Sequence, residues 1–295
     1  MKSKLSKFAL IFAAVLPVSA SAAGFGQFNS TQARADVVTS SGVMTLSGSA
    51  INGAEARKLG FNRGETRLAF PLGTLQGQID MRWFKSSNVS QIDTYNNSLL
   101  GAVHVLVPTA NGHVGLFAGA VHTEQGTQRK NSSRRLFTGV EIASFTAPHT
   151  RFDLQAGIIF HTGGLDGRGK DSLTNAGFIA VAATSPLSAQ TSVDFTLAAA
   201  YGQMDFDKIP PDAVLAVSAS IAVTHRLKNQ RGRIFARWEV TTFNRRSAGT
   251  NLLENRISVG FKLPFGKPAP AGNREFAQHL APIGRWVAQT GGPLK

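Results

Sequence analysis

The sequence predicts an all-β protein that folds as an antiparallel up-and-down transmembrane β-barrel of 12 strands, with 10 strands as the alternative. Segments of about ten residues alternate apolar and polar side chains, which is the period-two pattern of a strand. Short and long connections alternate between these segments, as in barrels that cross a membrane. Beyond residue 22 no apolar run approaches the roughly 20 residues of a membrane-spanning helix. A crossing of the membrane would therefore use a closed barrel.

The chain begins with a predicted export signal over residues 1–22. Three lysines precede the apolar run 8–18, and the small residues 19–22 follow it. This is the pattern of a cleaved secretory signal peptide. The sequence contains no cysteine, so disulfides and thiolate metal sites are excluded.

Three further segments are predicted after the signal. They are an N-terminal periplasmic segment (23–36), the transmembrane barrel (37–265) and a C-terminal periplasmic tail (266–295). The tail is rich in proline and glycine. We expect it to contact peptidoglycan or to fold into the lumen as a plug, with a loosely ordered tail as the alternative.

The predicted strands differ in how clearly apolar and polar residues alternate along them. In the segment 75–83, Leu75, Ile79 and Trp83 share one face and Gln76 and Asp80 the other. The clearest segments are 75–83, 151–161, 192–201, 233–241 and 256–265. Less polar segments lie at 98–107, 113–123, 135–145, 175–185 and 213–225. Two fainter ones, at 37–49 and 66–72, raise the count from ten to twelve.

The predicted connections fall into two classes. Short turns are expected near 108–112, 146–150, 186–189 and 226–231. Long polar loops are expected near 85–97, 124–134, 163–174, 203–212 and 244–254. An even strand count places both chain ends on the periplasmic side, where the short turns lie. A secreted soluble β-sandwich, which also alternates apolar and polar residues, is the alternative fold.

The polar faces of the predicted strands carry charges of both signs. The predicted lumen-lining residues are Asp80, Arg82, Glu141, Arg151, Asp153, Asp194, Arg233, Arg237, Glu239, Arg256 and Lys262. Such a lining favours a hydrated path for small polar solutes. In the alternative, the charges pair into salt bridges that fill a closed lumen, because twelve strands make a narrow barrel.

Basic residues also gather in the predicted long loops. They are Arg129, Lys130, Arg134, Arg245 and Arg246. Guanidinium groups there are suited to binding lipopolysaccharide phosphates or attracting anions, and merely solvated loops are the alternative. Removal of the three signal lysines lowers the formal net charge from +14 to +11. Nucleic acid is not expected as a partner, because its binding motifs are absent and export separates the chain from it.

No catalytic, cofactor-binding or metal-binding site is predicted, and no cofactor is expected. Histidines lie on the predicted strands at His104, His122 and His161. A lipid-modifying enzyme would need a nucleophile paired with one of these bases, and the sequence offers no recognisable pair. We therefore expect a protein that is not an enzyme.

The last predicted strand carries apolar residues at alternate positions and ends at Phe265. It resembles the terminal strand that the barrel-assembly machinery of Gram-negative bacteria reads. In size and strand count, residues 37–265 resemble twelve-stranded barrels such as the autotransporter translocator domain, in architecture only. Translocators usually end at that aromatic residue, whereas 30 residues follow Phe265 here. The resemblance implies an outer-membrane location, with outer-membrane lipid, lipopolysaccharide and the assembly machinery as partners.

Two functions are compatible with these features. The first is a narrow passive channel or structural barrel for small polar or anionic solutes. The alternative is a surface adhesin or ligand-binding barrel that acts through its basic external loops.

Overall fold

The computed structural model describes the twelve strands, most of the turns between them and one helix. The described residues are 33–49, 57–88, 96–109, 111–125, 131–145, 150–161, 173–204, 212–228, 231–245, 250–266 and 280–289. The predicted signal peptide lies outside these residues. No helix among them is both long and apolar enough to span a bilayer.

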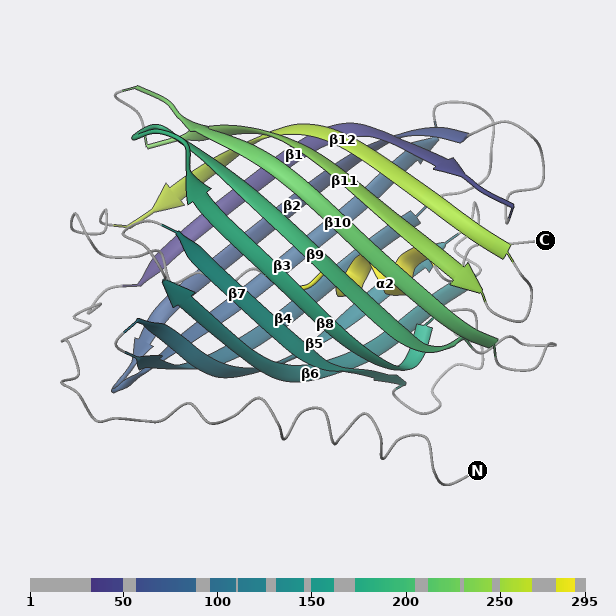
Figure 1. Ribbon diagram of the computed structural model, residues 1–295, viewed down its shortest axis with the longest axis horizontal. Coiled ribbons are helices and arrows are strands. Elements are labelled where there is room, and N and C mark those ends of the chain that lie inside the picture. The colour runs from purple at the N-terminus through teal and green to yellow at the C-terminus, as the bar shows by residue number, and fades with distance from the viewer. Residues whose placement is uncertain are drawn as a thin grey trace.

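Twelve strands form one closed sheet (Figure 1). They are β1 (Arg34–Ser47), β2 (Arg57–Leu72), β3 (Leu75–Asn88), β4 (Asn96–Thr109), β5 (Gly112–Gln125), β6 (Asn131–Phe145), β7 (Arg151–His161), β8 (Leu173–Pro186), β9 (Thr191–Met204), β10 (Asp212–Arg226), β11 (Arg233–Arg245) and β12 (Thr250–Phe265). Each strand pairs antiparallel with its neighbours in the chain, and β1 pairs with β12 to close the ring. The predicted up-and-down barrel of twelve strands is thereby confirmed, and the sandwich alternative is wrong.

The alternation of the sequence separates the two faces of the sheet. Outward-facing Leu116 and Ile257 are 64% and 65% exposed, whereas inward-facing His104 and Glu141 are fully buried. The outer face is thus largely apolar while the inner face carries many polar groups. A sheet with this arrangement is stable where hydrocarbon surrounds it.

The connections lie at the two ends of the barrel as the sequence predicts. At one end the turns are short, and β2 joins β3 through a two-residue turn in which Gly73 has φ +64°. A positive φ in such a hairpin favours glycine because it has no Cβ. The start of β1 and the end of β12 lie at this same end, where Ala35 pairs with Phe265. We call it the short-turn end and the opposite one the long-loop end.

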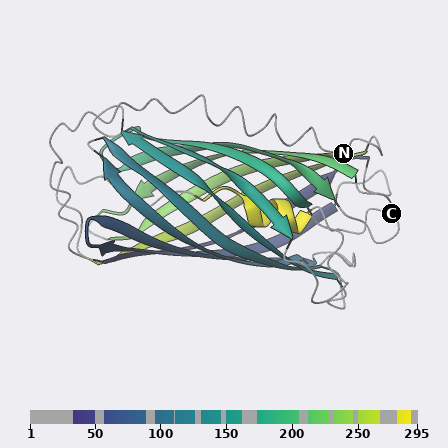
Figure 2. The same cartoon turned by 90° about the horizontal axis from the view of Figure 1, so that it is seen from below.

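A helix lies inside the barrel. The helix α2 (Ile283–Gln289) and the preceding residues 280–282 belong to the segment that the sequence analysis assigned to a periplasmic tail. Both views show α2 enclosed by the strands (Figures 1 and 2). Leu280, Ile283 and Trp286 are buried against the inner wall. Of the placements that the sequence left open, these described residues adopt that of a plug.

Candidate functional site

The inner wall has an apolar layer toward the long-loop end. Its aromatic members include Phe61, Phe84, Phe117, Phe137 and Phe178, all buried. They form one cluster with residues of α2. Aromatic rings pack closely here: Phe117 lies 6.1 Å from Phe178 between ring centroids, and Phe178 lies 6.0 Å from Trp286. The apolar layer thus surrounds the helix.

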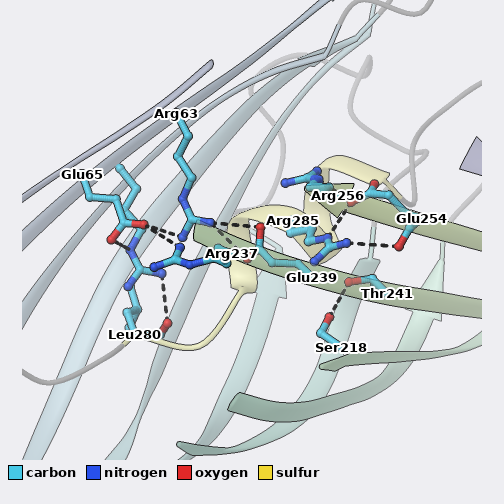
Figure 3. Close-up of polar contacts among 11 residues, drawn as sticks. Arg63, Glu65, Ser218, Arg237, Glu239, Thr241, Glu254, Arg256, Leu280 and Arg285 are labelled. Carbon is cyan, nitrogen blue, oxygen red and sulfur yellow. Dashed lines mark hydrogen bonds and ion pairs between the residues drawn. The ribbon is translucent and has the colours of Figure 1, made fainter. Parts of the chain in front are cut away.

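A charged layer crosses the middle of the barrel. It consists of Arg63, Glu65, Arg67, Asp80, Arg82, Arg237 and Glu239. Glu65 is 2.5 Å from Arg63 and 3.7 Å from both Arg82 and Arg237. Arg63 also reaches Glu239 on β11 at 3.2 Å (Figure 3). Four guanidinium groups therefore share three carboxylates in this layer.

A second chain of polar contacts runs along the wall from the charged layer. Arg67 lies 3.2 Å from Asp80, and Asp80 lies 3.6 Å from Nε2 of His104. Nδ1 of His104 is 2.8 Å from Glu141. The side-chain amide of Gln155 then donates to Glu141 at 2.8 Å. Buried polar groups require partners of this kind, and the chain supplies them across five strands.

The tail meets the barrel first through its backbone. Arg82 donates to the carbonyl oxygen of Leu280 at 2.9 Å. Figure 3 labels Leu280. The side-chain oxygen of Gln155 accepts from the N–H of Ala281 at 2.7 Å. These two contacts hold the tail at the boundary between the charged and apolar layers.

Two side chains of α2 make further polar contacts. Arg285 donates to Glu254 at 2.6 Å, and Arg256 lies 2.6 Å from the same carboxylate oxygen. The indole N–H of Trp286 donates to Ser218 at 2.9 Å, and Ser218 also contacts Thr241 at 2.8 Å. Figure 3 shows Arg285 and Glu254 beside one another.

The helix bridges opposite walls of the barrel. On one side it packs against β4 and β5, where a Cβ added at Gly284 would lie 3.5 Å from Leu100 and 3.8 Å from Val121. On the other side it reaches Ser218 on β10 and Glu254 on β12. Because β4 and β10 are six strands apart in a ring of twelve, they face each other. Residues of the helix consequently span the lumen from wall to wall, while the helix itself runs along the length of the barrel (Figures 1 and 2).

The structure places all of the predicted lumen-lining residues on inward faces. Several are paired there: Arg151 with Asp153 at 2.7 Å, and Lys262 with Asp36 at 2.9 Å. Asp194 accepts from Thr184 at 2.7 Å. The others named from the sequence are Asp80, Arg82, Glu141, Arg233, Arg237, Glu239 and Arg256, all buried or half-buried.

The basic residues assigned to external loops are placed differently. Arg134 lies within β6, where it faces outward and is exposed. Arg245 lies within β11 and faces inward, with its Nε 3.9 Å from Asp212. Both are strand residues because β6 and β11 extend further than the alternation alone indicates. Arg129, Lys130 and Arg246 lie outside the described residues.

Sequence reasoning missed part of the charged layer and its link to the tail. Arg63, Glu65 and Arg67 lie on β2, of which only residues 66–72 were expected as a strand. Glu254 was assigned to a loop, and Arg285 to the tail without a role. The inward series at 59, 61, 63, 65 and 67 alternates with small or polar residues, so its signal is present but weak.

The fold is that of the outer-membrane β-barrels. An outer-membrane channel from Pseudomonas putida F1 is 13% identical with a TM-score of 0.54, covering 82% of this chain and 100% of that one. The NanC porin is 11% identical with a TM-score of 0.50, covering 77% and 98%. The translocator domain of autotransporter NalP from Neisseria meningitidis is 14% identical with a TM-score of 0.41, covering 80% and 90%. No protein-family model and no curated protein matches the sequence.

Proposed function

We propose that this protein is an outer-membrane channel for small polar solutes, preferentially anions, and that its own residues 280–289 close it. The observation that carries the proposal is the charged layer directly beside a helix that lies inside the lumen and contacts opposite walls. Rings of guanidinium groups are typical of anion pathways. Four of these groups share three carboxylates here, which leaves a local positive excess.

A purely structural role explains the lumen less well. Salt bridges that only filled the barrel would pair basic and acidic groups evenly, since an unbalanced buried charge is destabilising. The seven residues of the charged layer include one more guanidinium than carboxylate, with Glu141 the next carboxylate beyond His104, and Arg82 of this layer donates to a backbone carbonyl of the tail. A carbonyl is a weaker partner for a guanidinium than a carboxylate is. The layer therefore favours an additional anion.

The mode of attachment supports a tail that can leave. The described part of the tail is held through side chains of the barrel and does not pair with any strand. Its release would leave every strand ladder intact. Release of residues 280–289 therefore requires side-chain contacts to break but no strand pairing, which is typical of gating elements.

Conductance in planar bilayers tests the proposal. We expect the full-length protein to conduct weakly and the Arg285→Ala, Trp286→Ala double variant to conduct at least tenfold more, with an anion-selective reversal potential in a salt gradient. Arg134→Ala, which alters an outward-facing residue, is the matched control and should behave as the unaltered protein does. Absence of conductance from a folded double variant would disprove the channel, and cation selectivity would disprove the anion preference.

We also propose that lipopolysaccharide and outer-membrane lipid surround the barrel. The exposed apolar outer face and the outward-facing Arg134 support this proposal. Guanidinium groups bind phosphates with charge-assisted hydrogen bonds. Arg134→Glu should then reduce the lipopolysaccharide that remains bound through purification, whereas Arg134→Lys should retain it. Equal retention by both variants would disprove a contribution from Arg134.

A further inference from the structure

One peptide group of the tail is recognised on both of its polar atoms. The carbonyl of Leu280 and the N–H of Ala281 belong to the same peptide bond. Arg82 donates to that carbonyl at 2.9 Å, and Gln155 accepts from that N–H at 2.7 Å. The orientation of the Gln155 amide is set by Glu141, to which its nitrogen donates at 2.8 Å. The barrel thus presents a donor and an acceptor at the spacing of a peptide backbone.

Separate groups of the wall recognise side chains of the same segment. The carboxylate of Glu254, fully buried, accepts from Arg285 at 2.6 Å. The hydroxyl of Ser218 accepts from the indole of Trp286 at 2.9 Å. The apolar layer receives the indole ring and Ile283, both fully buried. Main-chain and side-chain recognition together are how proteins bind short peptides.

We propose that the lumen contains a peptide-binding site that residues 280–289 occupy in the closed state. The exchangeable ligand is a short peptide with an apolar, a basic and an aromatic residue at the spacing of Ile283, Arg285 and Trp286. The proposal deepens the channel function, on which it rests in one respect: the tail must be able to leave the lumen.

Other ligand chemistries fit these groups less completely. A small inorganic anion would contact Arg82 but offers no donor to Gln155 or Glu254. A lipid chain would fill the apolar layer but would leave Gln155 without its donor and Glu254 with Arg256 alone. Buried polar groups without partners are destabilising. A peptide satisfies Arg82, Gln155, Glu254 and Ser218 at once.

The covalent link of the tail determines how the site can be tested. A tethered segment competes with an effective concentration of about 1 mM. A free peptide of similar intrinsic affinity would therefore be excluded from the unaltered protein at micromolar concentration. The Arg285→Ala, Trp286→Ala double variant weakens the tail without altering a barrel residue, so its site should become accessible.

Fluorescence anisotropy of a labelled synthetic peptide with the sequence of residues 280–289 is the direct test. The folded full-length double variant should bind it saturably and at least tenfold more tightly than the unaltered protein does. A control peptide carrying Arg285→Ala and Trp286→Ala should bind at least tenfold more weakly than the intact peptide. Glu254→Gln, added to the double variant, should weaken the intact peptide but leave a peptide with Arg285→Gln nearly unaffected. Equal binding of intact and control peptides, or no binding to a folded variant, would overturn the proposal.

Bilayer conductance separates this inference from the channel function. The intact peptide should reduce the conductance of the double variant by occupying the lumen again. A variant that binds the peptide but never conducts would disprove the channel and retain the peptide site. A variant that conducts but is not blocked at saturating peptide would disprove the peptide site and retain the channel.

Discussion

The carboxylate of Glu254 joins the last strand to Arg285 of the tail through a contact of 2.6 Å. The same oxygen lies 2.6 Å from Arg256, and all three groups are buried. Glu254 therefore compensates two guanidinium groups, one from the wall and one from the plug. Removal of Glu254 and removal of Arg285 should lower the free energy of unfolding by different amounts, because each leaves a different uncompensated charge in the barrel interior.

Glu254→Gln should destabilise the folded protein more than Arg285→Gln does. The loss of the carboxylate leaves two buried cations, and breaking a buried ion pair costs about 3–5 kcal/mol. The loss of Arg285 leaves Glu254 beside Arg256 and should cost less. Urea unfolding in lipid vesicles measures both free energies. Equal losses would show that Arg256 does not share the charge of Glu254.

Replacing Gln155 should release the tail. Gln155→Met keeps the side-chain length but removes the acceptor for Ala281 and the donor to Glu141, which costs about 1–3 kcal/mol. The released population should rise by roughly 5- to 150-fold, measured as trypsin cleavage after Arg285 by mass spectrometry. Gln78→Met is the matched control, because Gln78 is also buried and donates to Asp80 on its own strand. Similar cleavage of the two variants would contradict the role of Gln155.

Trp286 should contribute through its ring more than through its N–H. Trp286→Phe loses the hydrogen bond to Ser218, which costs about 1 kcal/mol. Trp286→Ala also leaves a cavity beside Phe178 and should cost about 3–5 kcal/mol. Trypsin cleavage after Arg285, measured by mass spectrometry, should be compared for the two variants. Ser218→Ala combined with Trp286→Phe should add little to either single change, and full additivity would show that the two residues do not interact.

A charged residue introduced on the outer face should destabilise the barrel more when it lies near the middle of the membrane than near its edge. Ile257 lies at the middle of β12 and is 65% exposed, so Ile257→Arg should cost about 2–4 kcal/mol in a bilayer. Leu263 lies outward near the short-turn end of the same strand, and Leu263→Arg should cost about 0–1 kcal/mol. Unfolding in lipid vesicles compares them. Equal costs would indicate that hydrocarbon does not surround this part of the barrel.

The barrel was predictable because its two faces differ in polarity along each strand. The alternation at 75–83 assigns Asp80 and Arg82 to one face without any knowledge of neighbouring strands. On β2 the inward residues Leu59 and Phe61 are apolar, while the outward Lys58 and Asn62 are polar, so the usual pattern is reversed there. Leu59 and Phe61 belong to the apolar cluster that also contains residues of α2.

The plug itself could not be located from the sequence. Its proline- and glycine-rich beginning is equally typical of a loose tail, and α2 has only seven residues. Arg285 and Trp286 acquire their roles from Glu254 and Ser218, which are 31 and 68 residues away. Only the closed barrel brings these groups together, so a pattern of neighbouring residues in the sequence cannot predict such contacts.

The site of α2 implies an order of assembly. Its partners Arg82, Gln155, Ser218 and Glu254 lie on β3, β7, β10 and β12, and they converge only when the ring is complete. The seam between β1 and β12 joins Ala35 to Phe265, the two extremes of the barrel sequence. Docking of the helix is thus expected late in biogenesis. Resistance of the Arg285–Trp286 bond to trypsin would mark a molecule in which β1 and β12 have already paired.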